Sequence, residues 1–193
     1  MIAARALTAL AQFSTTKTNF WLGFLFDGVM FVVLFGSGIT HSGVKAGIVA
    51  LAFFGGLFVF SFVEYFFHRW LFHRWITIMV KGHQAHHENP LGYDSLPFFV
   101  PSLVYLAIAW LLQLLLPVEY ALLLAAGFVL GYITYGLTHF ILHRHRFKSI
   151  IGRKLVAYHQ IHHYHPGFNF GVTSPIWDII LGTRYQSGHR RMW

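Results

Sequence analysis

Four stretches of the sequence are apolar over a length that can cross a bilayer, and they constrain the fold more than any other feature. A helix needs about 20 apolar residues to span the hydrocarbon core. Short connections join the stretches in pairs, which predicts two helical hairpins. The apolar stretches cover about residues 20–39, 46–67, 97–116 and 120–138, and the connections lie around His41 to Lys45 and at Pro117 to Glu119.

The composition agrees with a membrane protein. Hydrophobic residues make up 56% of the 193 residues and charged residues only 10%, which lies outside the averages for soluble proteins. The net charge of +8 comes from basic residues that flank the apolar stretches, so it predicts no nucleic-acid partner. Under the positive-inside rule these basic residues place one side of the protein in the cytosol.

The chain combines 14 histidines with only six acidic residues and no cysteine. Six carboxylates are too few for a carboxylate-rich di-iron site of the four-helix-bundle kind. The absence of cysteine excludes thiolate metal sites and thiol catalysis. Any metal site must therefore rely on imidazole nitrogens.

Ten of the histidines form four motifs in two segments, at about 68–96 and 139–185, which follow the second and fourth apolar stretches. An even number of membrane crossings separates the two segments, so they emerge on the same face and can meet in one site. The motifs are HRWLFH (His68, His73), HQAHH (His83, His86, His87), HFILH (His139, His143) and HQIHH (His159, His162, His163).

Helical geometry indicates how these histidines are shared between metals. At about 100° per residue, histidines four apart lie on one face of a helix and can bind one metal. Adjacent histidines such as His86 and His87 lie about 100° apart, so each HxxHH triplet can reach two metals. His68 and His73 are expected to diverge by roughly 140°. Ten imidazoles on two metals give five for each, with one position open on both.

The spacing alone does not choose the metal, because imidazole binds iron, copper, zinc and nickel. A structural zinc site closes with four ligands. Ten histidines exceed that number, which favours a redox metal that activates oxygen. A zinc-handling membrane protein is the alternative from another class. Transport normally places ionisable residues inside the spans, whereas these histidines lie at the ends of the spans.

Several other side chains are candidates for supporting the metal ligands. We expect at least one nearby acid to hydrogen-bond a ligand imidazole, since such bonds orient metal ligands. The candidate acids are Glu64, Glu88 and Asp178. His145 and His165 lie close to the motifs and are further candidates as ligands or as supporting groups, whereas His41 and His189 are expected to be solvated or interfacial.

The order of the motifs resembles the fatty acid hydroxylase and sterol desaturase superfamily, most closely its sphingolipid fatty acyl 2-hydroxylase branch. The resemblance covers about residues 50–185 and includes FNFGVTSPIWDIILGT after the last motif. It implies an all-α integral membrane protein in which four transmembrane helices carry a cytosolic helical cap over a dimetal site, as a single domain over residues 1–193. It also implies two non-haem iron ions on the ten motif histidines, with zinc able to replace iron in purified material.

The same resemblance implies the activity of an oxygen-dependent lipid hydroxylase, a monooxygenase with a lipid acyl chain and molecular oxygen as substrates. The expected reaction is 2-hydroxylation of a fatty acyl group. The sequence begins only about 20 residues before its first span, so we expect a separate electron donor, cytochrome b5-like or ferredoxin-like. The expected location is a bacterial inner membrane or the endoplasmic reticulum, with the site on the cytosolic face. Carotenoid ring hydroxylases and sterol desaturases or oxidases are the alternatives within the superfamily.

Overall fold

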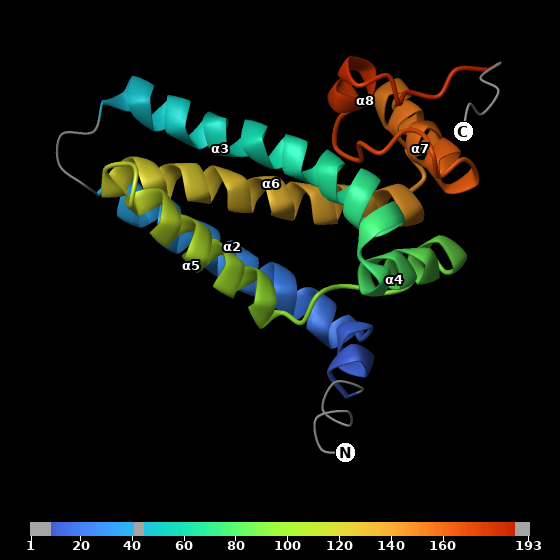
Figure 1. Ribbon diagram of the computed structural model, residues 1–193, viewed down its shortest axis with the longest axis horizontal. Helices are drawn as coiled ribbons and strands as arrows, with labels where there is room; N and C mark the ends of the chain where they lie inside the picture. Colours follow the sequence, from blue (N-terminus) through green and yellow to red (C-terminus); the bar gives the residue numbers. More distant parts are fainter. Residues whose placement is uncertain (1–8, 41–44, 188–193) are drawn as a thin grey trace. The chain divides into compact units, whose positions relative to one another are not determined.

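The computed structural model describes residues 9–40 and 45–187, and within these ranges it contains helices and no strand (Figure 1). The predicted all-α class is confirmed for this part of the chain. Residues 41–44 of the first hairpin connection lie outside it. The helices are α2 (Lys17–Ile39), α3 (Ala46–Phe66), α4 (Thr77–Glu88), α5 (Phe99–Gln113), α6 (Val118–Arg144), α7 (Ile150–Tyr164) and α8 (Ile176–Ile180), with a π-helix, η1 (Phe67–Trp75), between α3 and α4.

Three of the four expected spans are helices long and apolar enough to cross a membrane. They are Lys17–Ile39, Ala46–Trp75 and Val118–Arg144. The stretch predicted at 97–116 forms the apolar helix α5, which has only 15 residues and is about 22 Å long at 1.5 Å per residue. It ends early because residues 114–116 form a turn before Pro117, and a proline disfavours helical geometry in the residue before it.

The chain divides into two compact units, which we call the apolar unit and the histidine unit. The apolar unit comprises Met1–Phe60 and Gly92–Ile133, and the histidine unit comprises Ser61–Leu91 and Thr134–Trp193. All four histidine motifs fall in the histidine unit. The helix predicted at 120–138 continues to Arg144 as α6, so His139 and His143 stand on this helix and not on a segment after it.

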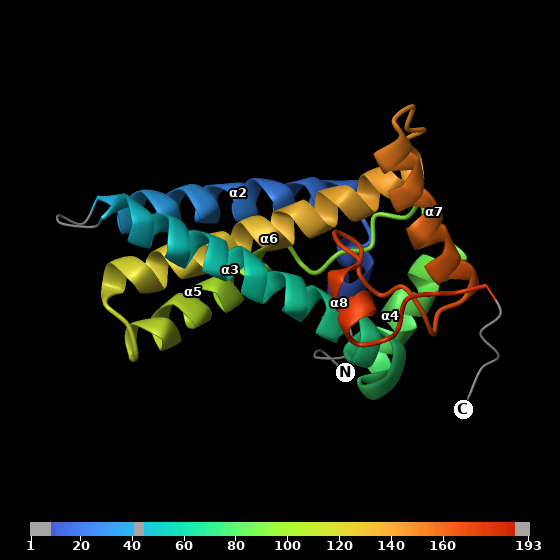
Figure 2. The same cartoon turned by 90° about the horizontal axis from the view of Figure 1, so that it is seen from above.

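Within the apolar unit, α3 and α6 lie side by side and approach each other at two glycines (Figures 1 and 2). A Cβ atom placed on Gly56 would lie 2.0 Å from the carbonyl oxygen of Leu124, and one on Gly127 would lie 2.0 Å from that of Phe53. Only glycine allows two helix backbones to come this close, a common device where membrane helices pack.

Helices α2 and α5 of the apolar unit are joined at their starts by the buried amide of Asn19. Its Nδ2 donates to the hydroxyl of Ser95 and to the carbonyl of Leu96, both at 2.9 Å. Its Oδ1 accepts from the backbone N–H of Phe98 at 2.9 Å. One polar side chain therefore ties the loop before α5 to α2. The core of the unit is apolar and includes Leu34, Tyr105, Ala125, Ala126 and Val129.

The close approach of α3 and α6 predicts that Gly56→Ala destabilises the protein. The added methyl group has no room against the Leu124 carbonyl, and overpacking of this kind costs about 1–3 kcal/mol. Gly55→Ala is the matched control, because a Cβ there meets nothing within 4 Å. Thermal unfolding in detergent should show a lower midpoint for Gly56→Ala only. Equal midpoints for the two variants would contradict the packing described.

Candidate metal centre

The ten motif histidines converge in two groups of five within the histidine unit. One ring nitrogen from each member lies within 4.8 Å of those of the other four. The predicted meeting of the two histidine-rich segments is therefore confirmed. Site A consists of His68, His73, His83, His87 and His162, and site B consists of His86, His139, His143, His159 and His163.

Each HxxHH triplet divides its histidines between the two sites. On α4, His83 and His87 belong to site A, whereas His86 belongs to site B. On α7 the assignment is reversed, because His159 and His163 belong to site B and His162 to site A. This is the sharing that helical angles predicted, since histidines four apart share a face and the third histidine faces about 100° away. Each helix therefore contributes two histidines to one site and a single histidine to the other.

His68 and His73 lie in the same site, and their predicted divergence is wrong. The prediction assumed an α-helix, but Phe67–Trp75 is a π-helix. Hydrogen bonds from i to i+5 bring residues five apart together on successive turns. The two imidazole rings are accordingly 5.3 Å apart, and both belong to site A.

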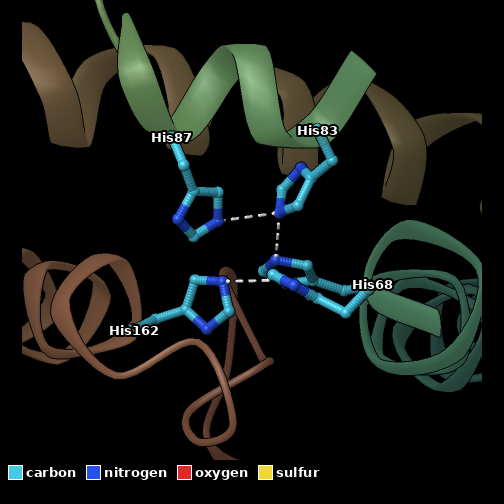
Figure 3. Close-up of side chains that lie close together, drawn as sticks. His68, His83, His87 and His162 are labelled. Carbon is cyan, nitrogen blue, oxygen red and sulfur yellow. Dashed lines mark hydrogen bonds between the residues drawn. The ribbon is translucent and has the colours of Figure 1, made fainter. Parts of the chain in front are cut away.

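The imidazoles of site A face one another through their Nε2 atoms, as Figure 3 shows for four of them. The Nε2 atom of His83 lies 3.0 Å from that of His68 and 3.0 Å from that of His87. The Nε2 atoms of His73 and His162 are 3.2 Å apart. These rings come from η1, α4 and α7, so three separate elements supply one cluster of nitrogens.

Site B has the same construction, with rings from α4, α6 and α7. The Nε2 atom of His143 lies 3.3 Å from that of His139 and 2.8 Å from that of His159. The Nε2 atoms of His159 and His163 are 3.2 Å apart. The Nε2 atom of His86 is buried without a hydrogen-bond partner among the described residues. A buried polar nitrogen without a partner is costly, and a metal ion would satisfy it.

Two imidazoles of site A are fixed from behind by backbone carbonyls. The Nδ1–H of His68 donates to the carbonyl of Phe170 at 2.5 Å, and that of His162 donates to the carbonyl of Phe168 at 2.8 Å. A carbonyl can only accept, so the hydrogen of each neutral ring is on Nδ1. The lone pair on Nε2 therefore points into the site, the arrangement that metal-binding histidines adopt.

Residues 53–183 match the fatty acid hydroxylase family model. The match covers more than half of the chain. The chain belongs to the fatty acid hydroxylase family. The family predicted from the four histidine motifs is thereby confirmed.

Similar proteins in this family are ceramide and fatty acyl hydroxylases. The ceramide very long chain fatty acid hydroxylase scs7 of Schizosaccharomyces pombe is 32% identical over 78% of this chain and 47% of its own length. The dihydroceramide fatty acyl 2-hydroxylase FAH1 of Arabidopsis thaliana is 31% identical over 66% of this chain and 58% of its own. The human fatty acid 2-hydroxylase is 33% identical over 66% of this chain and 38% of its own. The chain thus spans about half the length of these relatives.

A solved structure has the same fold. The structure of full-length scs7p, in which only the hydroxylase domain is visible, superimposes with a TM-score of 0.78 and 28% sequence identity. The superposition covers 93% of this chain and 71% of the other. The chain therefore has the fold of the hydroxylase domain in this family.

Burial keeps the histidines of this family member neutral. Desolvation, followed by the neighbouring imidazole His143, lowers the pKa of His86 to about 3. Desolvation, followed by His87, lowers the pKa of His163 to about 3. Burial also lowers the pKa of His162 well below its ordinary value. Neutral imidazole is the form that binds metal, so these rings need lose no proton when an ion binds.

The acidic residues support the site in a different way from the one expected. Both oxygens of Glu64 accept hydrogen bonds from Val172 and Thr173. Asp178 accepts from the backbone of Phe170 and Gly171. Neither carboxylate hydrogen-bonds an imidazole. Both hold the backbone of the loop at 168–173, and carbonyls of this loop accept the hydrogen bonds from His68 and His162.

The remaining candidates lie outside both sites. Glu88 is exposed and accepts a long hydrogen bond of 3.4 Å from Gln84. His145 is exposed and packs against Phe147, with ring centroids 4.8 Å apart. His165 stacks on Tyr185 at 4.8 Å. His41 and His189 lie outside the described residues.

The loop at 168–173 is the part of the site that sequence reasoning missed. Its backbone carbonyls accept from two site A histidines, His68 and His162. A carbonyl is present at every position, so this role is marked by no residue type. The local signal is weak and consists of Asn169 followed two positions later by Gly171. Asn169 is buried with φ at 55°, a left-handed conformation for which asparagine is enriched. It also binds the carbonyl of Tyr158 through its side chain.

The tight loop predicts that Gly171→Ala disturbs this part of the protein. A Cβ there would lie 2.1 Å from the carbonyl oxygen of Ser174 and 3.1 Å from a carboxylate oxygen of Asp178. We expect a loss of about 1–3 kcal/mol in the free energy of unfolding. Gly167→Ala, where a Cβ meets nothing within 4 Å, should leave it nearly unchanged. Chemical denaturation in detergent measures both, and a stable Gly171→Ala protein would refute the described loop geometry.

Proposed function

We propose that the chain is a membrane lipid hydroxylase that inserts one oxygen atom from molecular oxygen into an acyl chain, at carbon 2 of a fatty acyl group. The observation that carries the proposal is the pair of five-nitrogen groups built from four histidine motifs. Two such groups are suited to a pair of redox metal ions. The relatives named above, which act on ceramide and fatty acyl groups, support the substrate class.

In this proposal the ten histidines of sites A and B hold two iron ions. The fit rests on the donor set, which is all imidazole, and on the converging Nε2 atoms. Five imidazoles leave one position open on a six-coordinate ion. When bound, the iron pair supplies the activation of oxygen and, with two electrons and two protons from outside, the oxidation of a C–H bond to C–OH with release of water. Zinc fits the same nitrogens and can replace iron during purification.

The residues around the histidines orient the rings and exclude water. The buried ring of Phe170 lies 5.8 Å from the ring of His68 and 5.6 Å from that of His162. The ring of Phe72 stacks on His83 with centroids 5.3 Å apart. Aromatic walls of this kind lower the local dielectric and keep solvent from a reactive centre.

The proposal includes a single membrane domain over residues 1–193, with α5 as its fourth span and with the histidine-rich segments at about 68–96 and 139–185 on the cytosolic face. The basic residues beside the motifs support this orientation, since cytosolic segments are rich in lysine and arginine. They include Arg69, Arg74, Lys81, Arg144, Arg146, Lys148, Arg153 and Lys154. A separate redox protein, cytochrome b5-like or ferredoxin-like, would deliver the electrons. The membrane is a bacterial inner membrane or the endoplasmic reticulum.

The metal assignment predicts two metal ions per chain and a selective effect of His162. His162→Ala removes one of the five nitrogens of site A, so metal content should fall to about one ion per chain. His165→Ala is the control, because this nearby ring stacks on Tyr185 and belongs to neither site. Elemental analysis of protein purified in detergent measures the content. Two retained ions in His162→Ala would contradict the assignment.

The hydroxylase assignment predicts an oxygen added to acyl chains in a host that expresses the protein. Mass spectrometry of total lipids should show 2-hydroxy acyl chains with the wild type, and growth under ¹⁸O₂ should label the new hydroxyl group. His143→Ala should abolish the product because it removes a nitrogen from site B. His145→Ala, which alters an exposed ring outside both sites, should keep it.

Other results of the same measurement would replace the proposal. Oxygenated carotenoids or sterols with unchanged acyl chains would indicate a carotenoid ring hydroxylase or a sterol oxidase. Metal binding without any oxygenated lipid would favour the zinc-handling alternative.

A further inference from the structure

The two proposed metal sites differ in the hydrogen bonds that the Nδ1 atoms of their histidines make. The loop at 168–173 accepts hydrogen bonds from two imidazoles, His68 and His162, and both belong to site A. In site B, the Nδ1 atom of His159 is buried without a hydrogen-bond partner. His68 and His162 of site A are therefore held by hydrogen bonds to backbone carbonyls, whereas His159 of site B has no such bond.

The carbonyls that support site A belong to one loop, and Asp178 fixes that loop from within the protein. The carboxylate is fully buried. Its Oδ1 accepts from the N–H of Phe170 at 2.9 Å, and its Oδ2 accepts from the N–H of Gly171 at 2.7 Å. The same residue, Phe170, donates its N–H to Asp178 and accepts from His68 with its carbonyl. The backbone of a single residue thus connects the carboxylate to a ligand ring.

Two hydroxyl groups hold the carboxylate in turn. The hydroxyl of Thr183 donates to Oδ1 at 2.6 Å, and the hydroxyl of Tyr158 donates to Oδ2 at 2.8 Å. Each carboxylate oxygen therefore accepts two hydrogen bonds, and none of the four donors is an imidazole. This arrangement fixes the position of the loop backbone on both sides of Phe170.

We propose that Asp178 is a positioning residue for site A alone, and that it sets the metal affinity of that site through the loop at 168–173. The inference rests on the metal assignment of the proposed function. It deepens that assignment by making the two sites unequal. Outer contacts of metal ligands typically change metal affinity by about 10–100-fold when they are removed, and here the whole effect falls on one of two ions.

Asp178→Asn is the sharpest substitution, because it keeps the size of the side chain and breaks the hydrogen-bond pattern. Each carboxylate oxygen accepts from a backbone N–H, and a backbone N–H can only donate. An asparagine amide must therefore set its NH₂ group against one of these two donors, whichever way it is flipped. Glu88→Gln is the matched control. It removes the same charge beside the ligand His87, from an exposed carboxylate with no bond to the loop.

The experiment measures zinc affinity of the full-length protein in detergent, by titration against a competing chelator, with one site disabled at a time. In a His143→Ala background only site A is complete, and in a His162→Ala background only site B is complete. We expect Asp178→Asn to weaken zinc binding about 10–100-fold in the first background and to leave it unchanged in the second. Glu88→Gln should change neither.

Equal weakening in both backgrounds, or none in either, would overturn the inference. If Asp178→Asn does not fold, Tyr158→Phe provides the same comparison in a milder form. It removes one hydroxyl donor from Asp178 and leaves both backbone bonds, so zinc binding should weaken several-fold at site A only, and equal weakening of both sites would again overturn the inference.

The test is independent of lipid chemistry, because zinc binding requires no substrate or oxygen. An unequal effect on the two sites in a protein that hydroxylates no lipid would refute the proposed reaction and keep this inference. Wild-type protein that binds fewer than two zinc ions would refute the metal assignment and, with it, the role of Asp178.

Discussion

The desolvation of ten imidazoles in one region is the constraint on which the rest of the histidine unit depends. A charged imidazole is disfavoured where water is excluded, and burial accordingly lowers the pKa values of His86, His162 and His163. A neutral ring has one N–H and one lone pair, so a lone pair aimed at the centre leaves the N–H pointing outward. A hydrogen-bond acceptor outside the centre then fixes the orientation of the ring. The loop at 168–173 supplies such acceptors to His68 and His162 of site A.

Features of the fold and site that follow from regular helical geometry could be predicted from the sequence. The apolar stretches marked the long helices, and the even number of stretches between the histidine segments predicted that these segments meet. The division of each HxxHH triplet between two sites follows from the angle per residue, and α4 and α7 are regular enough for that angle to hold. The predicted end of α6 at residue 138 was too early, because the apolar run stops there while the helix continues to Arg144.

The features that the sequence did not predict depend on backbone hydrogen bonds. The pairing of His68 with His73 requires π-helical bonding, which no composition rule marks, so an α-helical angle gave the wrong face. Asp178 and Glu64 were expected to hydrogen-bond an imidazole, but their partners are N–H groups of a loop that only the folded chain brings near them. Which atom a buried carboxylate binds is decided by tertiary structure and not by its distance along the sequence from a ligand.

The π-helix at Phe67–Trp75 ties the length of the first motif to its backbone hydrogen-bond pattern. Its two histidines meet because the number of residues between them matches a π-turn. The residues in between can vary in kind without moving either ring to another face. A single insertion or deletion among them would place one ring on a different side unless the helix type changed at the same time. Motif length and backbone hydrogen-bond pattern must therefore change together.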